Sequence, residues 1–183
     1  MAGHSSGFEQ QLRIGRIGEG VLATWLRKNK GYSVLPVYEK ELADGKGPVL
    51  FTGMGELIAP DLLCFRKQTA RGNDVIWFEA KTKSAFTWHR ITSTWVTGID
   101  LRHYEDYKRV DALSPFPVWL LFLHKDGIAK DTPAGMTSPT GVFGQSLAYL
   151  STHEHHRHDN WARGMVYWGL ETLRKLATLE ELD

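Results

Sequence analysis

Residues 118–124, VWLLFLH, are the most restrictive stretch of the sequence for the choice of fold. A half-buried strand alternates apolar and polar residues, whereas this run is apolar at nearly every position. It therefore predicts a strand that is buried on both faces. Pro115 and Pro117 precede the run and end the helical pattern before it. Together these features favour an α/β domain with a mixed sheet and helices on its faces.

Hydrophobic spacing and turn residues divide the preceding part of the chain into further elements. Residues 57–66 and 74–81 carry strand patterns, and the polar segment KQTARGN between them predicts an antiparallel hairpin. The other expected elements are a helix over 8–29, a strand over 32–38, a loop over 41–55 with a short strand at 49–51, an irregular stretch over 84–98 and a helix over 100–113.

Three glycines, Gly15, Gly18 and Gly20, interrupt the first expected helix. Each weakens a helix by about 1 kcal/mol relative to alanine. Their presence suggests close packing against another backbone, or a helix that begins late.

The last third of the chain has weaker signals. Residues 128–160 are rich in Gly, Pro, Ser, Thr and His and are expected to be largely irregular. A last strand over 164–169 and a terminal helix over 171–182 follow. We expect a core over residues 8–127, with residues 128–183 as an extension packed on the same domain.

Composition limits the class of protein. The chain has one cysteine, Cys64, so no intrachain disulfide can form, and a reducing cytoplasm is the expected compartment. No apolar run approaches the ~20 residues that span a bilayer, and the first residues lack the pattern of a secretory signal. The net charge of +1 argues against a broad, nonspecific DNA-binding surface. It does not exclude a nuclease, because acidic metal ligands offset basic phosphate contacts in the total.

The residues that indicate chemistry are Pro60-Asp61 and Glu79-Ala80-Lys81. Glu79 and Lys81 point to the same side of a strand, and Asp61 can lie beside Glu79 if the two strands pair. Two carboxylates at that distance repel each other unless a cation lies between them. A divalent ion such as Mg²⁺, with an ammonium group beside it, provides the charge that phosphodiester hydrolysis requires.

This pattern resembles the PD-(D/E)XK nuclease superfamily, which includes many restriction endonucleases, archaeal Holliday-junction resolvases and lambda exonuclease. The family core has the order helix, strand, strand, strand, helix, strand, as expected here over residues 8–124. Many members also carry a metal-binding glutamate in the first helix, and Glu19 holds that position in this chain. The resemblance implies a restriction endonuclease-like fold.

The resemblance also implies a mechanism. Asp61, Glu79 and the carbonyl of Ala80 would bind Mg²⁺, for which Mn²⁺ is a substitute, and Glu19 would assist through water or a second ion. Lys81 would orient the attacking water and stabilise the transition state. The expected function is a metal-dependent nuclease that hydrolyses phosphodiester bonds in nucleic acid, with DNA as the favoured substrate.

Several other residues are candidates for contacts around this site. Some members carry a Gln-x-x-x-Tyr pair on the helix after the lysine strand; His103 and Tyr107 have the same spacing here, with His in place of Gln. Lys83, Trp88 and Arg90 combine cations with an aromatic face and suit nucleic-acid binding. The alternative is that Tyr104 and Tyr107 are half-buried packing residues, and that Trp88 and Trp95 pack the irregular segment onto the sheet.

Other functions remain open at this stage. His153, His155, His156 and His158 form a cluster that suits a metal site, a weak phosphate site or a solvated loop. A noncatalytic nucleic-acid-binding or assembly module on the same fold is the main alternative function. A scaffold that binds a partner protein through residues 161–183 is a second alternative. Many nucleases of this kind act as dimers to cut both strands, so a homodimer is also open.

Overall fold

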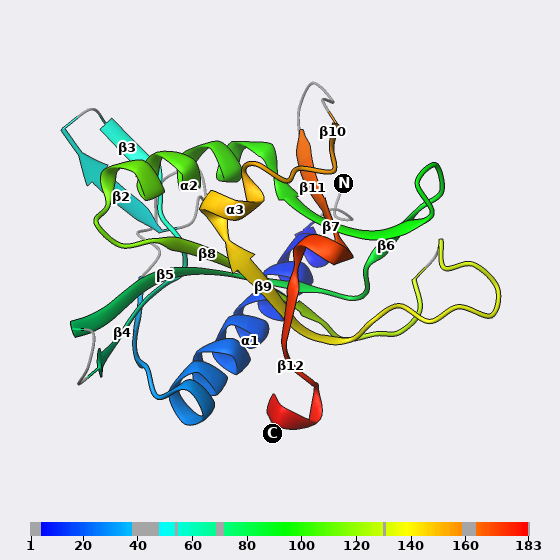
Figure 1. The fold of residues 1–183 in the computed structure, drawn as a ribbon, viewed down its shortest axis with the longest axis horizontal. Helices are drawn as coiled ribbons and strands as arrows, with labels where there is room; N and C mark the ends of the chain where they lie inside the picture. Colours follow the sequence, from blue (N-terminus) through cyan, green and yellow to red (C-terminus); the bar gives the residue numbers. More distant parts are fainter. Residues whose placement is uncertain are drawn as a thin grey trace.

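The computed structural model describes residues 5–37, 48–53, 55–68, 72–129, 131–158 and 164–182, and for residues 5–14, 16, 68, 72 and 73 it describes the backbone alone. The elements run in chain order as follows (Figure 1): α1 (Ser5–Lys30), β1 (Ser33–Pro36), β2 (Val49–Thr52), β3 (Gly55–Ile58), β4 (Leu62–Gln68), β5 (Gly72–Lys83), β6 (Thr87–His89), β7 (Thr94–Asp100), α2 (Leu101–Leu113), β8 (Val118–His124), β9 (Gly141–Ser146), α3 (Leu147–Leu150), β10 (His156–His158), β11 (Met165–Gly169), η1 (Leu170–Thr172), β12 (Arg174–Ala177) and η2 (Glu180–Leu182).

The central sheet has six strands in the order β1-β4-β5-β8-β9-β12. β5 and β8 are parallel, and the other described neighbours in this sheet are antiparallel. The chain order α1, β1, β4, β5, α2, β8 gives the expected helix, three strands, helix and strand, with the β2–β3 hairpin inserted before β4. The predicted α/β class with a mixed sheet flanked by helices is confirmed.

Strand β8 is buried on both faces, as the apolar run at 118–124 predicts. Leu120 and Phe122 pack in one core with α2, whereas Leu121 and Leu123 pack in a second core with α1. The two helices therefore cover opposite faces of the sheet (Figure 1). This arrangement separates the side chains of every central strand into an α1 side and an α2 side.

The expected strand over 57–66 is two strands. β3 pairs with β2, and β4 pairs with β1 and β5, so the chain changes partner at residues 59–61. Pro60 has no N–H for a ladder, and the carbonyl of Asp61 accepts a hydrogen bond from the N–H of Val37 at 2.9 Å. Parts of the expected strand, loop and turn lie outside the described residues. These are residue 38 of the strand, residues 41–47 and 54 of the loop, and residues 69–71 of the turn.

The expectation of an irregular stretch over 84–98 is wrong. β6 and β7 pair in an antiparallel hairpin that joins β11 and β10 in a second sheet. β7 is buried over both faces, so its side chains do not alternate in polarity. Gly98 lies where a side chain would meet the Tyr167 ring and the Val166 backbone.

The expected terminal helix over 171–182 is also wrong. β12 pairs with β9, and short 3₁₀ turns precede and follow it. Leu173, Leu176 and Leu179 have helical spacing, but Leu173 belongs to the α2-side core and the other two pack on the α1-side core. Residues 128–160, expected to be largely irregular, contain β9, α3 and β10. The strand expected over 164–169 is β11.

Among the described residues, no helix is long and apolar enough to cross a membrane.

Gly18 explains why one glycine is needed in α1. A β-carbon at this position would lie 2.7 Å from the Cβ of Thr82 on β5 and would overlap the Thr82 hydroxyl. The helix therefore approaches the strand more closely than a side chain allows. Gly15 and Gly20 have no atom within 4 Å of the corresponding position, so close packing does not explain them.

Gly18→Ala is therefore expected to reduce the free energy of unfolding by about 1–3 kcal/mol, because it overpacks the contact between α1 and β5. Gly20→Ala on the exposed face should stabilise the helix by up to about 1 kcal/mol. Urea denaturation of both variants measures the difference. Equal effects of the two substitutions would show that α1 does not lie against Thr82.

His124, at the end of β8, is a buried histidine with no exposed surface. Its ring stacks on Phe86 at 3.7 Å between centroids, with 14° between the planes. Burial, with the nearby charge of Lys83, lowers the pKa of His124 from 6.5 to about 3. The folded protein therefore holds this imidazole in its neutral form.

This depressed pKa predicts acid lability. The unfolded chain takes up a proton at His124 below pH 6.5, and the folded chain does so only near pH 3, so stability present above pH 6.5 is lost as the pH falls. His124→Phe should flatten the fall of unfolding free energy over this range and change stability at pH 7 by less than about 1.5 kcal/mol. Denaturant unfolding at several pH values tests this, and an unchanged pH slope would contradict it.

Candidate active site

The pairing of β4 with β5 brings Asp61 and Glu79 together. Leu62 lies opposite Phe78, so the same register places Asp61 opposite Glu79, just before β4 begins. Oδ2 of Asp61 accepts a hydrogen bond from the N–H of Ala80 at 3.0 Å. The side chain of Asp61 is thereby held across the strand that carries Glu79 and Lys81.

Glu79 is the most deeply buried member of this group, with 0% exposure. Its Oε1 forms an ion pair with Nζ of Lys81, and the Tyr107 hydroxyl lies within hydrogen-bonding reach of the carboxylate. Neither oxygen accepts a well-aligned hydrogen bond from the described residues. A buried carboxylate in this state is incompletely satisfied and favours a cation beside it.

The charges of the group act on one another. Burial and then the charge of Glu79 raise the pKa of Asp61 to about 8, against the lowering effect of Lys81. Burial lowers the pKa of the Lys81 ammonium, but the charges of Glu79 and Asp61 outweigh burial and raise it above its ordinary value. Lys81 thus remains a cation, and its side chain is 28% exposed, so it connects the buried pair to solvent.

Glu19 approaches the group from α1. Leu22 and Leu26 on the same helix are buried in the α1-side core, whereas Glu19 is half-buried. Its charge contributes to the raised pKa of Lys81, which places it near that ammonium. The structure therefore brings together Glu19, Asp61 and the pair Glu79 and Lys81 from three places in the sequence.

Helix α2 brings His103 and Tyr107 to the other side. Tyr107 is 1% exposed, and burial together with Glu79 and Asp61 raises its pKa well above the ordinary value. His103 is half-buried, and burial together with Lys81 lowers its pKa. Tyr107 thus lies near the carboxylates and His103 near Lys81. Tyr107 also packs in the α2-side core, so the two readings of that tyrosine are compatible.

The other candidate residues, Lys83, Trp88 and Arg90, differ in their position relative to the carboxylate group. Lys83 follows Lys81 on the same face of β5, where burial and the Lys81 charge lower its pKa. Trp88 packs edge-to-face against Trp95 at 5.0 Å and lies against the α2-side core. Arg90 is 79% exposed and pairs with Asp131 at 3.3 Å. No described contact joins Trp88 or Arg90 to the carboxylate group.

The donor set of the group fits a hard divalent cation. Asp61 and Glu79 offer carboxylate oxygens, and Mg²⁺ is commonly held by one or two carboxylates while it keeps several waters. In the part of the chain that the structure describes, no group of three or more His, Cys, Asp or Glu side chains is placed to hold a metal ion.

The histidine cluster has a different membership from the one the sequence indicated. Nδ1 of His155 lies 2.7 Å from Nδ1 of His156, and the His156 ring stacks between His89 and Tyr167. His89 comes from β6, which periodicity did not reveal. His153 stacks on Tyr149 instead. The described histidines form no group of three that could hold a metal ion.

No protein-family model matches the chain, and no curated protein matches it in sequence. Among solved structures, the chain is similar to D212, described as a nuclease from a fusselovirus. The two share 12% sequence identity and a TM-score of 0.41, with 97% of this chain and 90% of that chain covered. A likeness this weak assigns neither a family nor an activity to the chain.

Proposed function

We propose that this protein is a metal-dependent nuclease that hydrolyses phosphodiester bonds in nucleic acid, with DNA as its substrate. The observation that carries the proposal is the buried pair Asp61 and Glu79 beside the ammonium of Lys81. Burial of two carboxylates in contact opposes folding, because desolvation and repulsion both disfavour their charged forms. Because such a buried pair opposes folding, it indicates a functional site rather than a packing contact.

Asp61, Glu79 and the carbonyl of Ala80 would hold Mg²⁺, or Mn²⁺ in its place, with Glu19 assisting through water. When bound, the ion supplies a Lewis acid for the phosphate and neutralises the two carboxylates. The N–H of Ala80 fixes the direction of the Asp61 carboxylate. The Tyr107 hydroxyl lies within reach of the Glu79 carboxylate from α2.

Lys81 supplies a fixed positive charge. Hydrolysis adds water across a P–O bond, and negative charge increases on the phosphate oxygens in the transition state. The ammonium of Lys81 is held by Glu79 and reaches solvent, so it can contact a phosphate and orient the attacking water. Because its pKa is raised, it acts here as a cation and not as the base.

Lys83 extends this positive charge along the same face of β5 and is the neighbouring residue best placed to bind a phosphate of the substrate.

We propose the cytoplasm as the compartment, because the single cysteine, Cys64, is free and buried.

Asp61→Asn and Glu79→Gln should each reduce cleavage by at least about a hundredfold, since each removes one of two carboxylates that hold the ion. Stability without metal should be unchanged or slightly higher, because the repulsion is relieved. Cleavage is measured on labelled linear, nicked, branched and single-stranded DNA with Mg²⁺ and Mn²⁺. Thermal melting with and without metal should show stabilisation of the wild type but not of these two variants.

Asp74→Asn is the matched control, since Asp74 lies on the same strand, where it binds Tyr32 and Arg66. This variant should retain both cleavage and metal-induced stabilisation. Near wild-type cleavage by either site variant would show that the metal ligands are assigned wrongly. Metal-induced stabilisation and DNA binding without cleavage of any substrate would favour the noncatalytic module.

Lys81→Met should separate chemistry from metal binding. Loss of the ammonium removes a repulsion toward the ion, so calorimetry should show Mn²⁺ affinity unchanged or higher. Cleavage should fall by about 10²–10³-fold, or roughly 3–4 kcal/mol of barrier, because the charge that stabilises the transition state is lost.

Lys125→Met removes one exposed ammonium beyond the end of β8 and serves as its control. This variant should cleave at the wild-type rate. Normal cleavage by Lys81→Met would remove Lys81 from the mechanism, and loss of Mn²⁺ binding would mean that Lys81 acts on the ligands instead.

A further inference from the structure

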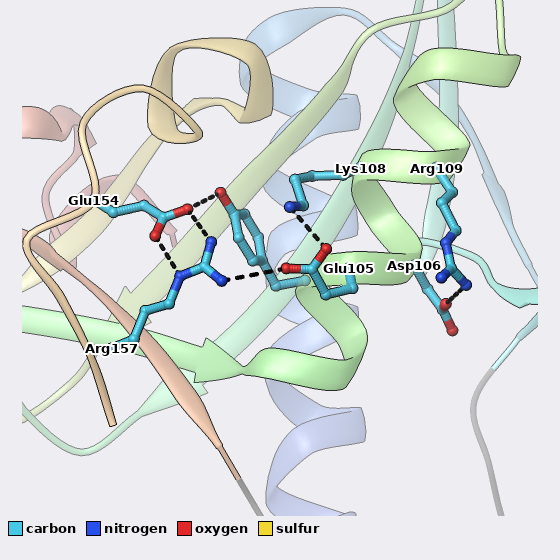
Figure 2. A network of polar contacts seen from close by, with 7 residues as sticks. Glu105, Asp106, Lys108, Arg109, Glu154 and Arg157 are labelled. Atoms are coloured by element: carbon cyan, nitrogen blue, oxygen red, sulfur yellow. Dashed lines mark hydrogen bonds and ion pairs between the residues drawn. The ribbon is translucent and has the colours of Figure 1, made fainter. Parts of the chain in front are cut away.

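A polar network joins the N-terminal half of α2 to the segment around β10 (Figure 2). The carboxylate of Glu154 accepts a hydrogen bond from the Tyr104 hydroxyl at 2.5 Å and two from the Arg157 guanidinium at 2.6 and 2.8 Å. Arg157 also reaches Glu105 at 3.6 Å, and Glu105 pairs with Lys108 at 2.7 Å. Residues some fifty positions apart in sequence are thus held together.

The hydrogen bonds of Glu154 are charge-assisted, and one of them is to a buried tyrosine. Arg157 binds Glu154 with two N–H groups, and such bidentate ion pairs fix the relative orientation of the two side chains as well as their distance. Tyr104 is 0% exposed, so its hydroxyl needs the partner that Glu154 provides. The hydrogen bond from Arg157 lowers the pKa of Glu154 against the opposing effect of burial, which keeps the carboxylate charged.

Helix α2 also forms a hydrogen bond with β3. Oδ2 of Asp106 accepts a hydrogen bond from the N–H of Ile58 at 3.2 Å, three residues before Asp61. Tyr104 and Tyr107 are one helical turn apart and lie on neighbouring parts of the helix surface. Tyr107 therefore approaches Glu79 from a helix that is held on one side by Glu154 and on the other by β3.

We propose that Tyr104, Glu154 and Arg157 are positioning residues for the active site, which hold α2 so that the Tyr107 hydroxyl stays against the Glu79 carboxylate. The proposal rests on the proposed nuclease function. It assigns to the segment after residue 128 a part in catalysis that the core motif does not contain.

The chain offers a matched comparison for this network. Asp74 accepts hydrogen bonds from the Tyr32 hydroxyl at 2.9 Å and from Nε of Arg66 at 3.1 Å. The same three groups, a tyrosine, a carboxylate and an arginine, thus occur twice. The Asp74 set joins β4, β5 and the end of α1.

The test compares Tyr104→Phe with Tyr32→Phe, each of which removes a single hydroxyl and keeps the ring. Tyr104→Phe should lower the single-turnover rate on the DNA that the wild type cleaves fastest by about tenfold, with DNA affinity unchanged. It should also weaken Mn²⁺ binding severalfold by calorimetry. Tyr32→Phe should change neither quantity, although both variants lose similar stability. Glu154→Ala and Asp74→Ala should repeat this contrast.

A double-mutant cycle with Tyr107→Phe shows whether the effect passes through that residue. In the Tyr107→Phe background, Tyr104→Phe should cause no further loss of rate or of Mn²⁺ affinity. Additive losses, or equal effects of Tyr104→Phe and Tyr32→Phe, would overturn the proposal. If the wild type binds Mn²⁺ but cleaves no DNA, the nuclease function fails and the Mn²⁺ cycle alone decides the positioning role. If it does neither, both proposals fail.

Discussion

The surrounding fold is built around the contact of Asp61, Glu79 and Lys81 at the middle of the sheet. Two ionised carboxylates beside one ammonium would place excess negative charge in a buried position, and burial together with this repulsion raises the pKa of Asp61 to about 8. The fold holds this group from three sides. β4 and β5 set the register, α1 is drawn close through Gly18, and α2 brings Tyr107 against Glu79.

The surroundings of the group explain how such a site can persist in a chain of this size. β8 lies next to β5 and is buried on both faces, so the strand that carries Glu79 and Lys81 is supported by a rigid neighbour. Asp106 and Glu154 hold α2 at two points (Figure 2 shows the second). Preorganised charge of this kind lowers a reaction barrier because little reorganisation is needed when charge develops.

The sequence was sufficient for features that are local or periodic. The run at 118–124, the helix over 100–113 and the paired strands around Asp61 and Glu79 all follow from patterns within a short window. Features that depend on distant partners could not be read. β7 lacks alternation because both its faces are covered. The segment around β12 has helical spacing of leucines, but Leu173 packs in one core and Leu176 and Leu179 pack on the other. The bond between Tyr104 and Glu154 spans 50 residues and leaves no local signal.

The most direct test of the central claim is anomalous diffraction from crystals of the protein grown with Mn²⁺. We expect a manganese peak between the carboxylates of Asp61 and Glu79, since those groups are held together at a cost that a divalent cation offsets. A map with no peak there, and with manganese only at other sites such as His155 and His156, would contradict it.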